Sequence, residues 1–305
     1  MWPQNIDWQV LYFGVEIEFV GGTPEKVDLL PGWHMDLDEQ HVDDSGTRSG
    51  AELQSPRMPW KNREDIRMML DRLVAAGAKA NWNCGLHVHV GLELWGEDIV
   101  LPLIESAFSC QSALQRLLKT AEDRRIFCPL ITSAMHDHFK ENPVRDSLVH
   151  RGRPQSHRCG VNVAAWFDIG TVEFRLANGS LNYCEVLRTI ELCLRYVAGV
   201  GAGCELPTEP VALAKALGAS RQGYPTAQTA PRWYQERMWL EEMLVPILAP
   251  VIEDLYPGAE ILEILPVAKG LTVEIERPDQ PNLLCLFKPT KNGWSYWKTV
   301  ENWSV

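Results

Sequence analysis

The sequence predicts an α+β fold in which a curved, mainly antiparallel sheet carries helices on one face and an open cleft on the other. A small C-terminal α+β appendage follows. Short segments alternate polar and apolar residues, which indicates strands with one covered face, whereas parallel strands are more often apolar throughout. Stretches with apolar residues at helical spacing lie between these segments, and the composition changes after residue 203.

Four segments with this alternation are predicted to be strands. They cover residues 14–19, 50–54, 84–91 and 171–176, with the sequences GVEIEF, GAELQ, CGLHVHVG and TVEFRL. Successive side chains of a strand point to opposite faces, so each strand has an apolar face and a polar face. The polar faces carry Glu16, Glu18, Glu52, Gln54, His87, His89, Glu173 and Arg175.

Helices are predicted between and after these strands. They cover residues 62–76, 98–121 and 182–199. Asn62 is the expected N-cap of the first helix, and Asn182 with Glu185 has the spacing of a capping box at the start of the third. We expect these helices to cover the apolar side of the sheet.

The C-terminal third differs from the rest of the chain. Residues 1–203 form the predicted main domain, and residues 204–230, rich in Pro, Ala and Thr, form a connecting segment. Residues 231–305 form the predicted appendage. Within it, residues 233–255 have the pattern of a helix, and residues 261–298 read as several β segments separated by turns.

Charge and apolar content limit the partners and the location. The 305 residues include 40 acidic and 29 basic side chains, for a formal net charge of -11, which argues against general binding to nucleic acid or anionic membranes. No stretch approaches the roughly 20 apolar residues that cross a bilayer, and the start has no signal-like pattern. The eight cysteines form no CxxC pair. We therefore expect a cytoplasmic protein with reduced thiols.

The polar strand faces point to metal and phosphate chemistry. On one sheet, four glutamates would lie close together and repel one another, and bound cations would relieve that repulsion. Oxygen ligands with an occasional imidazole suit Mg²⁺ or Mn²⁺ better than Zn²⁺. An arginine beside such ions fits a phosphate, so the set favours phosphoryl transfer. The chain has neither a GxxxxGK[ST] loop nor a GxGxxG motif.

The ordered motifs GVEIEF, GAELQSP, CGLHVHVG and GVNVAAWFDIGTVEFRLANGSLN resemble those of the amidoligase family over roughly residues 10–200. The resemblance implies that residues 1–203 form a catalytic domain with the fold of glutamine synthetase and glutamate-cysteine ligase. It further implies an ATP-dependent enzyme that joins a carboxylate to an amine through an acyl phosphate. The substrates would be small molecules or peptides, and the cofactors ATP and Mg²⁺ or Mn²⁺.

The resemblance also assigns roles to residues. It implies that Glu16, His87 and Glu173 bind the metal that holds the γ-phosphate, that Glu18 and Glu52 bind a second metal, and that Arg175 stabilises the moving phosphoryl group. Glu18, Glu173 and Arg175 are the implied catalytic residues. Arg175 and His89 are expected cofactor contacts, with His89 facing the substrate side or supporting the ligands. Arg158, from the basic run at residues 151–158 and not from the resemblance, is a further expected cofactor contact. Asp44 is a candidate third ligand of the second metal, although its surroundings also suit a turn.

Other interpretations of the same residues stay open. The basic run Arg151, Arg153, His157 and Arg158 is either a solvated loop or a clamp on nucleotide phosphates or an acidic substrate. His87 and His89 followed by Glu93 approximate the metal motif of cupins, which predicts a Mn or Fe site in a β-barrel. A third interpretation is a noncatalytic binding protein that retains a ligase fold.

Overall fold

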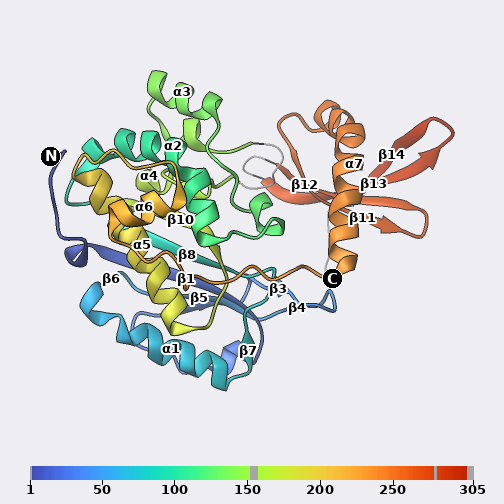
Figure 1. Cartoon of the computed structure of the whole chain (residues 1–305). Helices are drawn as coiled ribbons and strands as arrows, with labels where there is room; N and C mark the ends of the chain where they lie inside the picture. Colours follow the sequence, from blue (N-terminus) through green and yellow to red (C-terminus); the bar gives the residue numbers. More distant parts are fainter. Residues whose placement is uncertain (1, 152–156, 278–279, 301–305) are drawn as a thin grey trace. The chain divides into compact units, whose positions relative to one another are not determined.

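The computed structural model describes residues 2–151, 157–277 and 280–300, which form two compact units with separate hydrophobic cores (Figure 1). The first unit holds residues 2–150 and 157–229, and the second holds Arg151 and the described residues between 230 and 300. Among the described residues, no helix has the length and apolar character needed to cross a membrane.

An eight-stranded sheet in the first unit supports the candidate site. Its strands are β1 (Tyr12–Gly21), β2 (His34–Asp36), β5 (Ala51–Gln54), β6 (Met58–Pro59), β7 (Ala78–Lys79), β8 (Gly85–Gly91), β9 (Val161–Asn162) and β10 (Thr171–Asn178). The strand order is β2-β5-β1-β8-β10-β9, with β6 and β7 also paired to β1. Every described pairing is antiparallel, which confirms the predicted α+β class with a mainly antiparallel sheet. A separate hairpin joins β3 (His41–Val42) and β4 (Arg48–Ser49).

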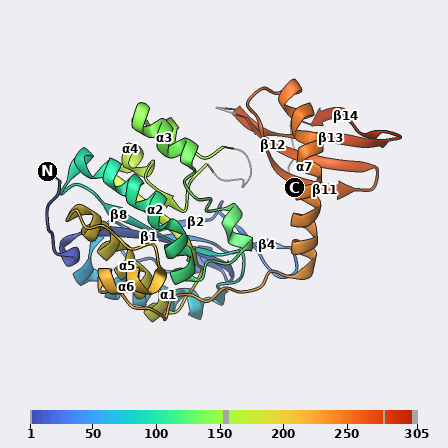
Figure 2. The ribbon, with the colours of Figure 1, turned by 45° about the horizontal axis from the view of Figure 1, so that its top comes forward.

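Helices cover the apolar side of this sheet. The α-helices of the first unit are α1 (Glu64–Ala75), α2 (Val100–Leu118), α3 (Ser133–Glu141), α4 (Ala165–Ile169), α5 (Tyr183–Gly201) and α6 (Pro210–Leu217). The short 3-10 helices are η1 (Trp8–Val10), η2 (Pro24–Lys26), η3 (Trp60–Asn62), η4 (Gly96–Ile99), η5 (Asp123–Ile126) and η6 (Arg145–Leu148). Helices α1, α2 and α5 contact β7, β10 and β8 respectively (Figures 1 and 2). Strand residues such as Ile17, Val88 and Val172 are fully buried in the same core as these helices.

Helix ends show where local signals succeed and where they fail. The Asn182 side chain accepts hydrogen bonds from the backbone N–H groups of Cys184 and Glu185, so the predicted cap of α5 is confirmed. Glu185 does not complete a capping box, because its carboxylate accepts from the Ser180 hydroxyl. The predicted Asn62 cap is wrong: the chain forms the 3-10 turn η3 first, and α1 begins after Arg63 without a side-chain cap. Predicted helix 98–121 is shorter, since α2 covers Val100–Leu118.

The second unit is a helix packed on a four-stranded antiparallel meander. It comprises α7 (Arg232–Leu255), β11 (Glu260–Val267), β12 (Gly270–Arg277), β13 (Gln280–Thr290) and β14 (Gly293–Val300). Leu248 and Ile252 of α7 are buried with Val273 and Phe287 of the strands. The elements match the predicted helix and β segments of this region.

Gly50 places β5, and with it Glu52, against β1. Its φ is +74°, and a Cβ there would lie 2.0 Å from the carbonyl oxygen of Phe19. We expect Gly50→Ala to destabilise the protein by about 2 kcal/mol or more, because a strained φ and a clash with backbone add together. Gly96→Ala is the matched control, since Gly96 has φ +62° and a Cβ added there would meet no atom within 4 Å. Thermal melts that show equal losses for both variants would contradict the clash.

Candidate functional site

The strand register brings the polar residues of four strands onto one face. Glu16 of β1 lies opposite His87 of β8 on one side and Gln54 of β5 on the other. Glu18 lies opposite Glu52, and Glu173 of β10 lies opposite His89. Side chains that are directly opposite on adjacent antiparallel strands are close neighbours. The six strand residues predicted to be metal ligands or catalytic groups, and the predicted cofactor contact His89, therefore lie on the same face.

Glu16 is at the centre of the cluster. Its Oε2 lies 3.0 Å from Nδ1 of His87, and its Oε1 lies 3.2 Å from Nε2 of His89. The other nitrogen of His89 lies 3.1 Å from the Thr171 hydroxyl. Burial raises the pKa of Glu16, but the hydrogen bonds to both histidines outweigh it and hold the pKa well below its usual range.

Glu18 contacts groups of the predicted strand 84–91 and also Arg124 and His41, which lie outside the predicted strands. Its Oε2 accepts a hydrogen bond from the Gly85 N–H and lies 3.5 Å from Nη1 of Arg124 and 3.8 Å from Nδ1 of His41. Its Oε1 lies 3.2 Å from Nε2 of His87. Burial raises the pKa of Glu18, but His87 and Arg124 lower it more, to about 2.

Glu173 and Arg175 form a buried ion pair. Nη1 of Arg175 lies 2.5 Å from Oε1 of Glu173, and the Asn162 side chain donates to Oε2 of Glu173 at 2.7 Å. The same Nη1 lies 3.4 Å from Nδ1 of His87. Burial raises the pKa of Glu173, but the Arg175 charge outweighs this effect and keeps the pKa low. Glu173 is therefore ionised in a site where it is only 2% exposed.

Glu52 is the carboxyl group that lacks compensation. It is 8% exposed, and its Oε1 accepts a hydrogen bond from the Gln54 side chain at 2.8 Å. Burial and the nearby charge of Glu16 raise its pKa to about 8. In this environment a cation beside Glu52 would favour the ionised form.

This raised pKa predicts how stability depends on pH. The folded protein keeps a proton on Glu52 that the unfolded chain releases above about 4.5, so the free energy of unfolding falls as pH rises from about 4.5 to about 8. Gln cannot ionise, and we expect Glu52→Gln to gain about 1 kcal/mol or more relative to wild type across this range, or roughly 2–4 °C in melting temperature. Melts at several pH values, with a chelator present, measure this. If the melting temperature of the wild type changes with pH as that of Glu52→Gln does, the raised pKa of Glu52 is contradicted. Glu122→Gln, at an exposed position, is the control.

Two groups of side chains in this cluster have ligand atoms close enough to hold a metal ion. One is Glu16, His89 and Glu173, and the other is Glu16, Glu52 and His87; within each group the ligand atoms lie within 4.8 Å of one another. Nε2 of His87 and Nε of Arg175 are buried and make no hydrogen bond with the described residues, although Nε2 of His87 lies 3.2 Å from Oε1 of Glu18. The carboxylate and imidazole donors, with a buried polar atom left unsatisfied, fit a divalent cation such as Mg²⁺ or Mn²⁺. The grouping differs from the implied one, which joined Glu16, His87 and Glu173 and placed Glu18 with Glu52.

For the other predicted residues the recorded contacts are with different groups. The Asp44 carboxylate accepts from the Trp82 indole N–H at 2.9 Å, and the Glu93 carboxylate pairs with Arg57 at the surface. Arg158 is exposed, two residues before Gly160, whose carbonyl accepts the backbone N–H of Arg175. Arg153 lies outside the described residues. The roles proposed for Asp44 and Arg158 stay predictions.

Three residues of the cluster were not predicted from the sequence: His41, Arg124 and Asn162. Arg124 comes from η5, where the run EDRR has the appearance of a solvated charged turn. His41 comes from the β3–β4 hairpin, and Asn162 from the two-residue strand β9. Asn162 sits in the GVNVAAW motif, which was the one available signal. On the face expected to be open, Glu18, Glu52, His87 and Glu173 are at most 8% exposed, whereas Glu16, His89 and Arg175 are half-buried.

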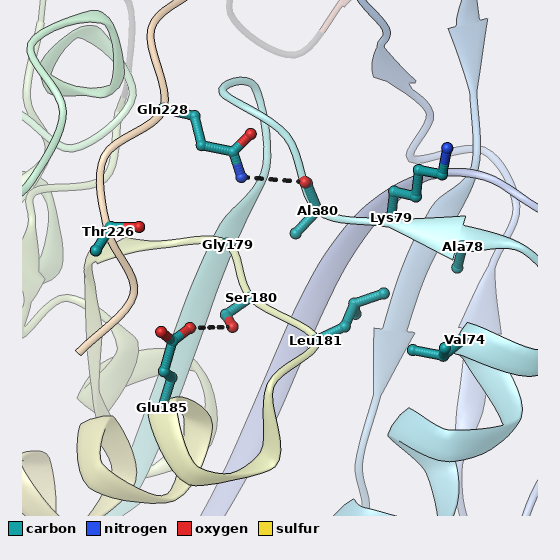
Figure 3. A pocket seen from close by; sticks show the side chains of 10 residues that line it. All are labelled: Val74, Ala78, Lys79, Ala80, Gly179, Ser180, Leu181, Glu185, Thr226 and Gln228. Carbon is teal, nitrogen blue, oxygen red and sulfur yellow. Dashed lines mark hydrogen bonds between the residues drawn. The ribbon is translucent and has the colours of Figure 1, made fainter. Parts of the chain in front are cut away.

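A separate pocket of about 330 Å³ lies beside β7 and the segment that follows β10 (Figure 3). Its lining includes Lys79 of β7, Ser180, Glu185 of α5 and Gln228. Gln228 donates to the carbonyl of Ala80, and Ser180 donates to Glu185 (Figure 3). The side chains of Gln228, Ser180 and Glu185 therefore each have a hydrogen-bond partner within the lining. The lining contains none of the clustered acidic or histidine residues, and we do not assign the site to this pocket.

A known protein family matches the segment of the chain that carries the clustered residues. A family model described as "Putative amidoligase enzyme" matches residues 9–197, well over half of the 305 residues and the whole of the clustered face. No curated protein matches the chain significantly. The family description denotes a ligase-type enzyme, and the chain belongs to this amidoligase family.

Proposed function

We propose that this protein is an ATP-dependent carboxylate–amine ligase, an amidoligase that forms an amide or peptide-type bond through an acyl phosphate. The proposal includes a glutamine synthetase-like catalytic domain with an open cleft in residues 1–203, ATP and Mg²⁺ or Mn²⁺ as cofactors, and small-molecule or peptide substrates. One observation carries it: four carboxylates, two imidazoles and Arg175 meet on one sheet face within the segment that matches the family.

The proposed reaction has two steps, phosphorylation of the acid and attack by the amine. An oxygen of the acid substrate attacks the γ-phosphorus of ATP, and ADP leaves with the electron pair of the broken P–O bond. The amine nitrogen then attacks the acyl carbon, loses a proton, and displaces phosphate. Divalent ions, when bound, would offset the charge of the phosphates. Arg175 would hold phosphoryl oxygens with its planar fork, and the carboxylates of Glu16, Glu52 and Glu173 would hold the ions.

The cupin-like alternative has less support. It requires Glu93 beside His87 and His89, whereas Glu93 pairs with Arg57 and belongs to neither metal-compatible group among the described residues. The noncatalytic alternative predicts metal binding without ATP turnover. Residues 204–230 remain the proposed connection and residues 231–305 a proposed appendage, to which we assign no role. Eight unpaired cysteines accord with a proposed cytoplasmic location.

Trapping the activated acid tests the proposal. The full chain is incubated with Mg-ATP, hydroxylamine and pooled amino acids, and hydroxamates are sought by mass spectrometry. Hydroxylamine is a strong nucleophile that takes the place of the amine, so we expect an ATP-dependent hydroxamate whose mass identifies the acid. Catalytic ADP release with Glu16→Gln at the wild-type rate would contradict the assignment of this site to the reaction.

A further inference from the structure

We propose that the nucleotide-free site binds one divalent cation, at Glu16, Glu52 and His87, and that buried Arg124 takes the place of a second cation at Glu18. This inference rests on the proposed function and deepens it. It concerns which of the four carboxylates carry charge that the protein itself does not neutralise.

Arg124 is a fixed positive charge beneath the site. It is 2% exposed, and among the described residues Glu18 is the carboxylate that pairs with it, with Nη1 at 3.5 Å from Oε2. Its Nη2 donates to the carbonyl of Arg175 at 3.4 Å. Gly85 leaves the space that the guanidinium occupies, because a Cβ there would lie 2.2 Å from Nη2. Packing therefore keeps Arg124 beside Glu18.

The geometry of Glu18 agrees with this role. Its Oε2 is directed at Arg124 and at the Gly85 N–H, and its Oε1 lies 3.2 Å from Nε2 of His87, so both oxygens already face groups of the protein. Glu18 belongs to neither group of residues that could hold a metal ion among the described residues. If Glu18 left Arg124 to bind a metal ion, the buried guanidinium would lose its carboxylate partner, which costs free energy. The Glu18–Arg124 pair is therefore favoured.

Glu173 is neutralised in the same way. Arg175 occupies its Oε1 at 2.5 Å, and the Asn162 side chain occupies its Oε2 at 2.7 Å. When no phosphate is bound, the Arg175 guanidinium stays beside Glu173. Its positive charge then takes the place of a metal ion in the group of Glu16, His89 and Glu173.

Glu16 and Glu52 are the carboxylates left for an added cation. Among the described residues neither pairs with an arginine or a lysine, and their ligand atoms lie within 4.8 Å of each other and of His87. Two carboxylates balance the charge of one divalent ion, and a ring nitrogen of His87 supplies the third ligand atom. This combination of oxygen ligands with one imidazole fits Mn²⁺ or Mg²⁺.

The experiment is a titration of the full chain with Mn²⁺, free of nucleotide, followed by calorimetry and by the electron paramagnetic resonance signal of free Mn²⁺. We expect one ion for the wild type and at least about a tenfold loss of affinity for Glu52→Gln. The double variant Glu18→Gln/Arg124→Met removes the pair without changing net charge. It should still bind one ion, with a loss clearly smaller than that of Glu52→Gln.

The single variant Arg124→Met is expected to change Mn²⁺ binding in the opposite direction. It frees the Glu18 carboxylate, so we expect tighter binding or a second ion, whereas a purely structural arginine would leave the count and affinity of Mn²⁺ unchanged. Two ions in the wild type, or a double variant as weak as Glu52→Gln, would overturn the inference. If Arg124→Met does not fold, the charge-neutral double variant decides. Hydroxamate formation is read separately, so a failure of the metal assignment is distinguishable from a failure of the ligase function.

Discussion

Replacing Arg175 by lysine is expected to lower ADP formation at saturating Mg-ATP and substrate by on the order of 100-fold or more, because arginines that stabilise a transferred phosphoryl group contribute about 10³ or more in rate. Lysine keeps the positive charge but loses the planar fork that binds two oxygens. The loss should therefore fall on turnover, while nucleotide affinity, measured by calorimetry, changes less.

The control for this variant is Arg145→Lys. Arg145 also pairs with a carboxylate, Asp168 at 2.8 Å, but both side chains are about half exposed and lie outside the cluster. If Arg175 served only as an ion-pair partner of Glu173, lysine would substitute tolerably. Near-wild-type turnover in Arg175→Lys would therefore remove the phosphoryl-stabilising role and return weight to the metal-binding alternatives.

Glu173→Gln is expected to lower ADP formation by on the order of 100-fold or more while the protein still folds. Gln retains the shape and an acceptor oxygen for Arg175 but loses the charge that a metal ion requires. The pKa of Glu173 is held low in the folded state, so its ionised form stabilises the fold above its ordinary pKa, and this contribution is lost as pH falls. We therefore also expect the melting temperature to fall, by on the order of 10 °C.

Two measurements separate catalysis from folding in this variant. Circular dichroism melts give stability, and ADP release per folded molecule gives turnover. Glu191→Gln is the matched control, since Glu191 pairs with Arg195 at 2.7 Å on α5, away from the cluster. If Glu173→Gln is strongly destabilised but its remaining folded molecules release ADP at the wild-type rate, Glu173 has no metal role.

Alternation along single strands was enough to predict which strand residues share one face of the sheet. The polar positions of β1, β5, β8 and β10 could be identified because side chains repeat every second residue. The strand order and register could not, since they depend on pairing between distant segments. These pairings place Glu52 opposite Glu18 and His89 opposite Glu173, and they produce the metal-compatible groups that differ from the implied sets.

The residues that cover the site could not be predicted in this way. Arg124 lies in a four-residue 3-10 helix and His41 in a two-residue strand, and segments this short have no periodicity to detect. Their positions follow from tertiary packing, as with the guanidinium of Arg124 above Gly85. Glu18, Glu52 and Glu173 are buried on the face expected to be open. The pKa of Glu18 is lowered by His87, which the strand pattern contains, and also by Arg124 and His41, which it does not.

The transfer of oxygen from the acid substrate to phosphate tests the central claim most directly. Once hydroxamate trapping has identified the acid, its carboxylate is labelled with oxygen-18, and the phosphate released during ligation is analysed by mass spectrometry. In the proposed reaction the attacking carboxylate oxygen stays on phosphorus when the amine displaces phosphate, so the released phosphate carries one labelled oxygen. Unlabelled phosphate, with ADP formed at the same rate as the amide, would contradict an acyl phosphate and with it the proposed mechanism.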